Sequence, residues 1–338
     1  LRKITGAEAA LVVNNNAGAT LLTLAALAGG KEVVVSRGQL IEIGGSFRLP
    51  DVMTSGGAIL REVGTTNKTR IHDYRDAINP QTAALMRVHT SNYVIEGFSE
   101  AASLGELVQL AHSRNLPLID DIGSGAVIDF SKYGVADEPV ASESIRAGAD
   151  LVLFSGDKLL GGPQCGIIVG RHALIQRIGK HPLMRALRVD KLILAALAAT
   201  LRCYADSNLA EQAIPLLQLL STAEENLKNR AERMAAQIAA TSIVEQAVAE
   251  ADFTYLGGGS VPTQRISTWT VTITPAHGSP DQLAKRLRSL SPAILARIHK
   301  DRLVIDLRSV FAHQDSRIVA ALAALMPTDS TEDGREGE

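Results

Sequence analysis

Lys158 stands where a predicted buried strand ends and a glycine-rich turn begins. The strand covers residues 151–155, and a Gly-Gly-Pro turn follows the lysine. Burial at such a place would lower the pKa of the amine and make Lys158 a nucleophile that can form a Schiff base. Ser155, the last residue of the strand, can offer a hydroxyl to a phosphate. A surface lysine in a β-turn is the alternative, and this segment alone favours neither interpretation.

Asp121 ends a second predicted strand, at residues 116–121. A carboxylate at the end of a buried parallel strand needs a partner. The protonated pyridine nitrogen of pyridoxal 5'-phosphate (PLP) is a suitable one, because that ion pair maintains the electron sink of the cofactor. The adjacent Asp120 is less suitable, since successive strand residues face opposite ways. The interval between Asp121 and Lys158 holds one helix and one strand, so the two can share a cleft. A helix N-cap or a loop salt bridge would explain Asp121 without a cofactor.

A run of small and amide residues precedes the apolar helix that we expect at residues 17–28. Asn16, Ala17 and Gly18 would leave backbone N–H groups free for an anion, and the helix dipole would assist. We interpret this run as a cup for a cofactor phosphate. Taken alone, the run favours an ordinary asparagine N-cap.

Four further side chains are candidates for the same site. His89 ends another strand on the predicted edge, and its imidazole would lie against a cofactor ring; a hydrogen-bonded core histidine is the alternative. Arg185 and Arg188 are three residues apart, so a helix would place them on one face, where paired guanidiniums suit an oxyanion. A solvated basic face is the alternative for the arginines. Asp157, next to Lys158, is a candidate to tune the lysine or assist proton transfer.

Short apolar strands alternate with helices in the first half of the chain, which predicts an α/β fold with a mostly parallel sheet between helices. The strands lack strict alternation, as expected when both faces are buried. The polar motifs fall at their carboxyl ends, where ligands of such sheets bind. The strands are predicted at residues 32–36, 58–63, 83–89, 116–121, 151–155 and 166–169, and helices at 17–28, 103–114 and 143–147.

The second half of the chain predicts a smaller C-terminal α+β domain. Residues 266–274 predict a half-buried strand, with threonines on one face and Trp269, Val271 and Ile273 on the other. Further strands are predicted at 293–298 and 303–307, and helices at 280–290 and 316–325. We therefore divide the chain into a PLP-binding large domain (1–205), a connecting helical region (206–240), a small domain (241–327) and a disordered acidic tail (328–338).

The composition of the 338 residues is 46% hydrophobic and 21% charged, which is typical of a soluble globular protein. No apolar run reaches the roughly 18 residues needed to cross a bilayer, so we expect no membrane partner. The net charge of −2 gives no sign of a nucleic-acid partner, and any such surface would be a local patch. The two cysteines lack metal-type spacing and fit a reducing cytoplasm.

Seven long motifs follow one another along the chain: TGAEAALVVNNNA (5–17), KEVVVSRGQLIEIGGSFRLPDVM (31–53), EVGTTNKT (62–69), VHTSNY (88–93), DIGSG (121–125), SGDKLLGGPQCGIIVG (155–170) and HPLMRALRVDK (181–191). Together they resemble the bacterial L-seryl-tRNA(Sec) selenium transferases, the selenocysteine synthases. The resemblance is strong from about residue 5 to residue 204 and looser beyond. Motifs this long and in this order are far more specific than any single pattern.

The resemblance implies a fold-type I PLP enzyme that carries its cofactor on Lys158 and binds selenophosphate with Arg185 and Arg188. It implies the conversion of seryl-tRNA(Sec) into selenocysteinyl-tRNA(Sec). Lys158 would remove the Cα proton, the β-hydroxyl would leave to give a dehydroalanyl intermediate, and selenium would add to the β-carbon. It also implies a cytoplasmic homo-oligomer.

The sequence departs from the family pattern in two respects. It lacks the family's N-terminal part, including a small tRNA-contacting domain, so we expect an N-terminally truncated member. Cys165 stands where a small residue such as alanine is typical, and we assign it no catalytic role.

Two other functions stay open. One is a PLP-dependent lyase acting on a small amino acid or amino-sugar acid, and the other is a non-catalytic assembly subunit. The stretch at residues 35–53 together with the arginine pair favours the transferase over the lyase. The intact Asp121 and Lys158 argue against a non-catalytic subunit.

Overall fold

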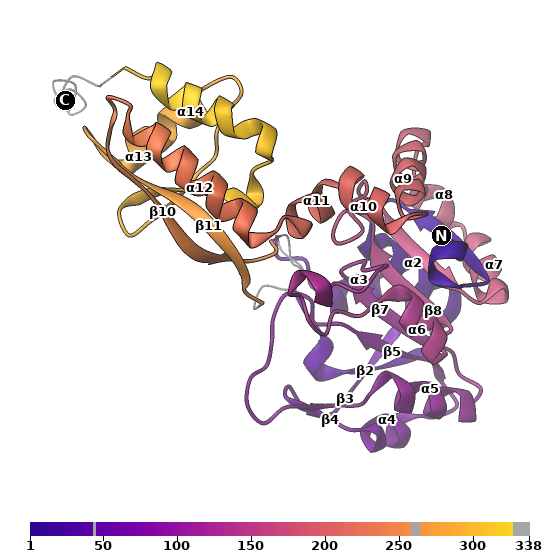
Figure 1. Cartoon of the computed structure of the whole chain (residues 1–338). Coiled ribbons are helices and arrows are strands. Elements are labelled where there is room, and N and C mark those ends of the chain that lie inside the picture. Colours follow the sequence, from indigo (N-terminus) through magenta and orange to yellow (C-terminus); the bar gives the residue numbers. More distant parts are fainter. Residues whose placement is uncertain (43–44, 258–263, 327–338) are drawn as a thin grey trace, which may run out of the picture. The chain divides into compact units, whose positions relative to one another are not determined.

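The computed structural model describes residues 1–42, 45–257 and 264–326, and the chain divides into two compact units (Figure 1). The first unit comprises Leu1–Leu216 and Leu256–Gln264, and the second comprises Leu217–Tyr255 and Arg265–Glu338. The tail predicted at residues 328–338 lies outside the described residues.

The first unit is built on a seven-stranded sheet in the order β1-β9-β8-β7-β5-β2-β3. Neighbouring strands from β8 to β3 are parallel, whereas β9 runs antiparallel to both β8 and β1. The sheet is therefore mostly parallel, as predicted. Its strands are β1 (Ala9–Val13), β2 (Glu32–Ser36), β3 (Ile59–Val63), β5 (Thr82–Val88), β7 (Leu118–Gly123), β8 (Leu151–Ser155) and β9 (Gly166–Gly170).

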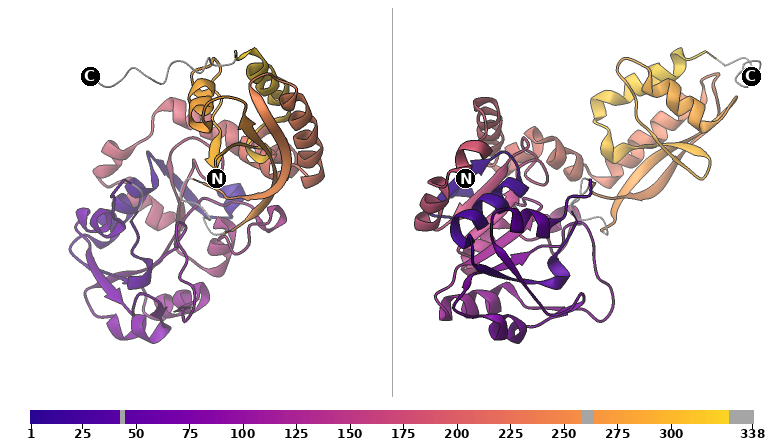
Figure 2. Two further views of the ribbon diagram at one scale, coloured as in Figure 1. Left: turned by 90° about the vertical axis from the view of Figure 1, so that its left-hand side faces the viewer. Right: turned by 180° about the vertical axis from the view of Figure 1, so that it is seen from behind.

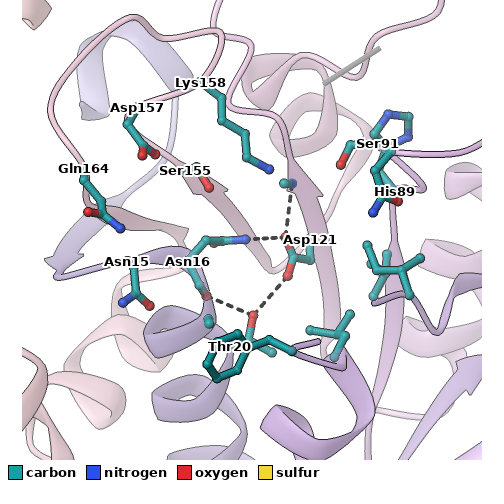
Figure 3. A pocket seen from close by; sticks show the side chains of 17 residues that line it. Asn15, Asn16, Thr20, His89, Ser91, Asp121, Ser155, Asp157, Lys158 and Gln164 are labelled. Atoms are coloured by element: carbon teal, nitrogen blue, oxygen red, sulfur yellow. Dashed lines mark hydrogen bonds between the residues drawn. The ribbon is translucent and has the colours of Figure 1, made fainter. Parts of the chain in front are cut away.

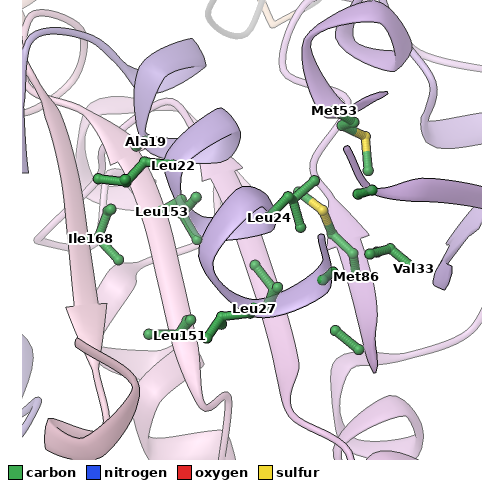
Figure 4. Close-up of a cluster of buried hydrophobic side chains, with 14 of the residues drawn as sticks. Ala19, Leu22, Leu24, Leu27, Val33, Met53, Met86, Leu151, Leu153 and Ile168 are labelled. Atoms are coloured by element: carbon green, nitrogen blue, oxygen red, sulfur yellow. The ribbon is translucent and has the colours of Figure 1, made fainter. Parts of the chain in front are cut away.

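Helices cover both faces of this sheet (Figure 2). Alternate residues of one strand enter different cores: Leu151 and Leu153 pack in the same cluster as α2, whereas Val152 and Phe154 pack in the cluster on the other face. Figure 4 shows leucines of α2 against the sheet. This two-sided burial explains why the strands read as continuous apolar runs. The helices are α1 (Arg2–Thr5), α2 (Asn16–Ala28), α3 (Leu49–Ser55), α4 (Ile71–Ala77), α5 (Leu104–Ser113), α6 (Ala141–Ala147), α7 (His172–Gly179), α8 (Leu183–Leu187), α9 (Lys191–Cys203) and α10 (Ser207–Ala213).

The second unit has a four-stranded antiparallel sheet in the order β10-β11-β13-β12 with its own hydrophobic core. The sequence predicts β11 as half-buried, but Thr268, Thr270 and Thr272 are buried as well. Thr268 donates a 2.6 Å hydrogen bond to Asp306, so this polar face is satisfied internally. The elements are α12 (Glu224–Ala239), β10 (Val244–Thr254), β11 (Ile266–Pro275), α13 (Pro280–Arg288), β12 (Arg297–His299), β13 (Arg302–Asp306) and α14 (Asp315–Ala324).

The connecting region predicted at residues 206–240 is helical, as α10, α11 (Pro215–Ser221) and α12. The helices α10 and α11 begin at Ser207 and Pro215. Within the described residues, no helix has the length and apolar character that crossing a membrane requires.

Candidate active site

A cavity of about 570 Å³ lies at the carboxyl ends of the parallel strands, within the first unit (Figure 3). Residues that directly follow β1, β5 and β8 contribute to its wall, as does β7 near its end. Sequence positions far apart therefore meet because parallel strands end at one edge of the sheet. Of the residues predicted for the site, the cavity is lined by Asn16, Ala17, His89, Asp121, Ser155, Asp157 and Lys158.

Lys158 lies in a tight turn after β8, and its side chain extends into the cavity towards Asp121 (Figure 3). The turn is held by backbone hydrogen bonds from Gly156 N–H to Cys165 (2.8 Å) and from Leu159 N–H to Ser124 (2.9 Å). The lysine is only partly buried, so the deep burial that the sequence predicts for it is wrong. The reason is that the cavity itself, which is open to solvent, occupies the space around the amine.

Two glycines near the Lys158 turn have no room for a side chain. A Cβ on Gly156 would lie 2.4 Å from the Cys165 sulfur, and one on Gly125, whose φ is 80°, would lie 2.2 Å from the Ser155 carbonyl oxygen. Burial raises the pKa of the Cys165 thiol to about 11. Cys165 is therefore a buried thiol that stays protonated at neutral pH.

Asp121 is a buried carboxylate held by neutral donors. Its Oδ1 accepts from the side-chain amide of Asn16 (2.9 Å) and from Gly123 N–H (3.1 Å), and its Oδ2 accepts from the Thr20 hydroxyl (3.0 Å). Burial raises the pKa of this carboxyl. In the part of the chain that the structure describes, no basic side chain forms an ion pair with Asp121. The site thus presents a buried acceptor that lacks a cationic partner.

Asp120 behaves differently because it points to the opposite face of β7. It is fully buried and pairs with Arg87, at 3.1 Å between carboxylate and guanidinium. Burial raises the pKa of Asp120, and the charge of Arg87 opposes that effect. Asp120 is absent from the cavity wall, as the alternation of strand residues predicts.

The start of α2 has the asparagine N-cap that the sequence favours, and its first turn borders the cavity. Asn15 is the N-cap, and its Oδ1 accepts from Gly18 N–H at 2.7 Å. This bond occupies the Gly18 donor, and Gly18 does not line the cavity. Asn16 and Ala17 do line it, in the first helical turn, where N–H groups precede the first intrahelical bond.

His89 follows β5 and lines the cavity, with 23% of its side chain exposed. Its backbone N–H donates to the Asp121 carbonyl oxygen at 2.8 Å. The imidazole Nε2 lies 3.5 Å from Oε2 of Glu138. The structure thus places His89 in a cavity wall and not in the closed core that was its alternative.

Arg185 and Arg188 are exposed and lie outside the cavity wall. Arg185 is in α8, but Arg188 is the C-cap and has extended backbone, so the two do not share one helical face. The strand bridge between Arg188 and Val13, and the bond from Asn14 N–H to Leu187 (2.9 Å), hold this segment against the turn before α2.

Sequence reasoning missed five polar residues of the wall: Asn15, Thr20, Ser91, Asn92 and Gln164. Thr20 is one turn after Asn16 on α2, so the helical period would have found it. Gln164 ends the Gly-Gly-Pro turn, and Ser91 belongs to the loop after β5. No local signal marks those two, because the loops that carry them are positioned by tertiary packing.

Comparisons with known proteins agree with this geometry. The family model described as L-seryl-tRNA selenium transferase matches residues 1–311. An L-seryl-tRNA(Sec) selenium transferase of Alkaliphilus metalliredigens is 49% identical over 322 residues, which cover 95% of this chain and 69% of that protein. An L-seryl-tRNA(Sec) selenium transferase of Hyphomonas neptunium is 51% identical over 308 residues, which cover 91% of this chain and 66% of that protein. The chain thus spans about two thirds of the length of these relatives.

Among solved structures, a D-glucosaminate-6-phosphate ammonia-lyase has a TM-score of 0.65 at 23% identity and covers 95% of this chain and 82% of that one. The fold is that of the fold-type I PLP-dependent enzymes, and PLP is the cofactor. The buried Asp121, which lacks a cation, and the Lys158 amine in the same cavity fit that cofactor. With half of its residues identical to those of curated relatives and a family match over 311 residues, the chain belongs to the L-seryl-tRNA selenium transferase family.

Proposed function

We propose that this chain carries the catalytic site for converting seryl-tRNA(Sec) into selenocysteinyl-tRNA(Sec), with Lys158 as its central residue. The observation that supports the proposal is that Lys158 and the uncompensated Asp121 face one cavity. A reactive amine and a buried carboxylate are the two groups that a PLP site needs, one for attachment and one for the ring nitrogen. We infer the substrate, seryl-tRNA(Sec), from the names of the relatives.

PLP, when bound, supplies the electron sink that allows a Cα–H bond and then the Cβ–oxygen bond of a seryl group to break. Lys158 holds the cofactor and then moves the proton at the seryl Cα. Asp121 orients the cofactor through its ring nitrogen, and Thr20 and Asn16 keep that carboxylate in place. His89 forms the wall beside it.

The phosphate of the cofactor is bound, in this proposal, by the first turn of α2 and by Ser155. Asn16 and Ala17 offer backbone N–H groups at the positive end of a 13-residue helix. Gly18 contributes indirectly: its N–H donates to the side chain of Asn15, and that bond stabilises the first turn of α2. Asp157, exposed next to Lys158, assists proton transfer; an Asp157→Asn variant with unchanged turnover would contradict that role.

Selenophosphate is the selenium donor in this proposal, and Arg185 and Arg188 bind it. Their exposure, and their position against the turn before α2, leave both guanidiniums available to an anion. The protein works as a cytoplasmic homo-oligomer; both cysteines are free thiols, as a reducing compartment requires. The chain spans about two thirds of its relatives' length, and in this proposal other parts of those proteins also contact the tRNA.

The test is to locate the cofactor chemically. We expect borohydride treatment of the PLP-loaded chain to add reduced PLP to the peptide that contains Lys158, as read by mass spectrometry. Lys158→Ala should lose the adduct, whereas Lys191→Ala, at the exposed start of α9, should keep it. An adduct at another lysine, or no adduct in a folded wild-type chain, would contradict the proposal.

The lyase alternative has less support. The ammonia-lyase shares the fold at 23% identity, whereas the selenium transferases share about half of all residues. The non-catalytic alternative does not explain why Asp121 is buried with no basic partner among the described residues.

A further inference from the structure

A further buried carboxylate, Glu138, touches the cavity histidine from outside the cavity wall. Only 3% of its side chain is exposed, and its Oε2 lies 3.5 Å from Nε2 of His89. Its Oε1 is buried and has no hydrogen-bond partner within the described residues. Burying an ionised carboxylate is costly unless it has a specific partner, and His89 is the partner that the contacts identify.

The loop that carries Glu138 is fastened on both sides of it. This loop runs between the 3₁₀ turn η2 (Ser131–Tyr133) and α6. Ala136 exchanges two hydrogen bonds of 2.5 Å with the side chain of Gln264, one as donor and one as acceptor. On the other side, Val140 pairs with Ala126. Glu138 is therefore held against His89 by contacts at both ends of its loop.

The other carboxylate near His89 is already engaged. Asp120 forms its ion pair with Arg87, at 3.1 Å between carboxylate and guanidinium. Glu138 is thus the acidic group whose oxygen faces the imidazole nitrogen directly. A carboxylate beside one ring nitrogen favours the proton on that nitrogen and fixes the orientation of the ring.

We propose that Glu138 is a positioning residue: it holds the proton of His89 on Nε2 and fixes the plane of the imidazole in the cavity wall. Nδ1 is then the nitrogen without a proton when the ring is neutral. The inference rests on the proposed function for the place that it gives to His89 beside the cofactor. The contact itself is a property of the cofactor-free chain.

The first test reads the tautomer without any cofactor. Two-dimensional ¹H–¹⁵N NMR of the full chain labelled at histidine distinguishes the two neutral tautomers, and a His89→Gln variant assigns the signals. We expect the Nε2–H pattern in wild type and a mixture of tautomers in Glu138→Met, which has a similar size but no charge or strong acceptor. Asp137→Asn is the matched control, because Asp137 is exposed in the same loop and its φ of 59° suits asparagine.

Glu138→Gln covers the case in which Glu138→Met does not fold. The amide keeps the shape of the side chain but not its charge, so the share of the Nε2–H tautomer should fall there as well. An unchanged tautomer in both variants, or in whichever of them folds, would overturn the inference. A change of the same size in Asp137→Asn would overturn it too, because the effect would then belong to the loop.

The second test measures PLP binding by absorbance titration. We expect Glu138→Met to raise the dissociation constant about tenfold, which is the smaller of the losses found when a metal-binding histidine loses its supporting carboxylate. Glu138→Asp should recover part of the affinity. The borohydride adduct at Lys158 should persist in every variant at saturating PLP.

The two proposals fail separately. If wild type forms no adduct at Lys158, the proposed function fails and the tautomer result still decides the role of Glu138. If the adduct forms but the dissociation constant and the tautomer do not respond to Glu138, the inference about Glu138 alone is wrong.

Discussion

At the scale of residues, two neighbouring aspartates of β7 have different surroundings because they face opposite sides of the sheet. Asp120 faces an arginine, whereas Asp121 faces an amide, a hydroxyl and a backbone N–H. Three neutral hydrogen bonds orient Asp121 but do not neutralise it. The ionised carboxylate therefore destabilises the cofactor-free chain. A cation bound next to it would offset that destabilisation.

We expect Asp121→Asn to stabilise the cofactor-free chain at neutral pH. Burial raises the folded pKa of Asp121 above its unfolded value, so its favourable contribution is complete below the unfolded pKa and is lost as the pH rises through the folded pKa. The asparagine can keep all three bonds, because its oxygen accepts from Asn16 and Gly123 and its amide donates to the Thr20 hydroxyl.

Urea unfolding of both chains between pH 3 and pH 8 provides the measurement. The advantage of Asp121→Asn should appear as the pH rises, while its affinity for PLP falls. If the variant has a lower free energy of unfolding than wild type over the whole pH range, the ionised Asp121 does not destabilise the chain and the prediction is wrong.

At the scale of elements, the cavity depends on how closely β9 approaches the turn before α2. Gly166 pairs with Val13 of β1 and with Ser155 of β8, so it lies between two strands that lead into the site. A Cβ at Gly166 would be 2.1 Å from the Asn15 carbonyl oxygen. The new Cβ is fixed to the backbone of β9, and the Asn15 oxygen belongs to the backbone before α2. The contact can therefore be relieved only by moving the strand or the start of the helix.

Gly166→Ala should therefore lower the free energy of unfolding by about 1–3 kcal/mol and weaken PLP binding, because the Asn15–Asn16 turn must shift. Gly105→Ala is the matched control: it lies in α5 with nothing within 4 Å of a new Cβ, and it should stabilise the chain by about 0.5 kcal/mol. Chemical denaturation and PLP titration measure both effects. If Gly166→Ala and Gly105→Ala have the same free energy of unfolding, β9 does not approach the turn before α2 as closely as described.

At the scale of the whole molecule, the cavity residues belong to the first unit, while the second unit has a separate core around α12, α13 and β11. Ligand binding stabilises the part of a protein that forms the site, by about 2.7 kcal/mol at a hundredfold excess over the dissociation constant. Added PLP should therefore act on the unfolding of the first unit.

Leu287→Ala tests this division. Leu287 is fully buried in the core of the second unit, and its truncation should cost that unit about 2–5 kcal/mol. The borohydride adduct at Lys158 should form as in wild type. Loss of the adduct in a chain whose first unit is still folded would show that the site depends on the second core.

The sequence by itself determined the elements whose pattern is local. Strands buried on both faces appear as short apolar runs, so all six predicted strands of the large sheet are present. In the two larger sheets, two strands were not predicted: β1 is short and alanine-containing beside a helix, and β10 is rich in alanine and glutamate, which favour helices. Their strand conformation comes from pairing with β9 and β11, and such pairing lies outside any local window.

The sequence also determined the family and pointed to the edge of the sheet where Lys158, Asp121 and His89 meet, because parallel strands bring their carboxyl ends together. Only the tertiary structure decided which donors hold Asp121, that Lys158 is partly exposed, that Arg188 leaves the helix of Arg185, and that Glu138 lies against His89. These features depend on the course of loops and on contacts between distant segments. Close packing of the whole unit sets them, and no periodicity in the chain encodes them.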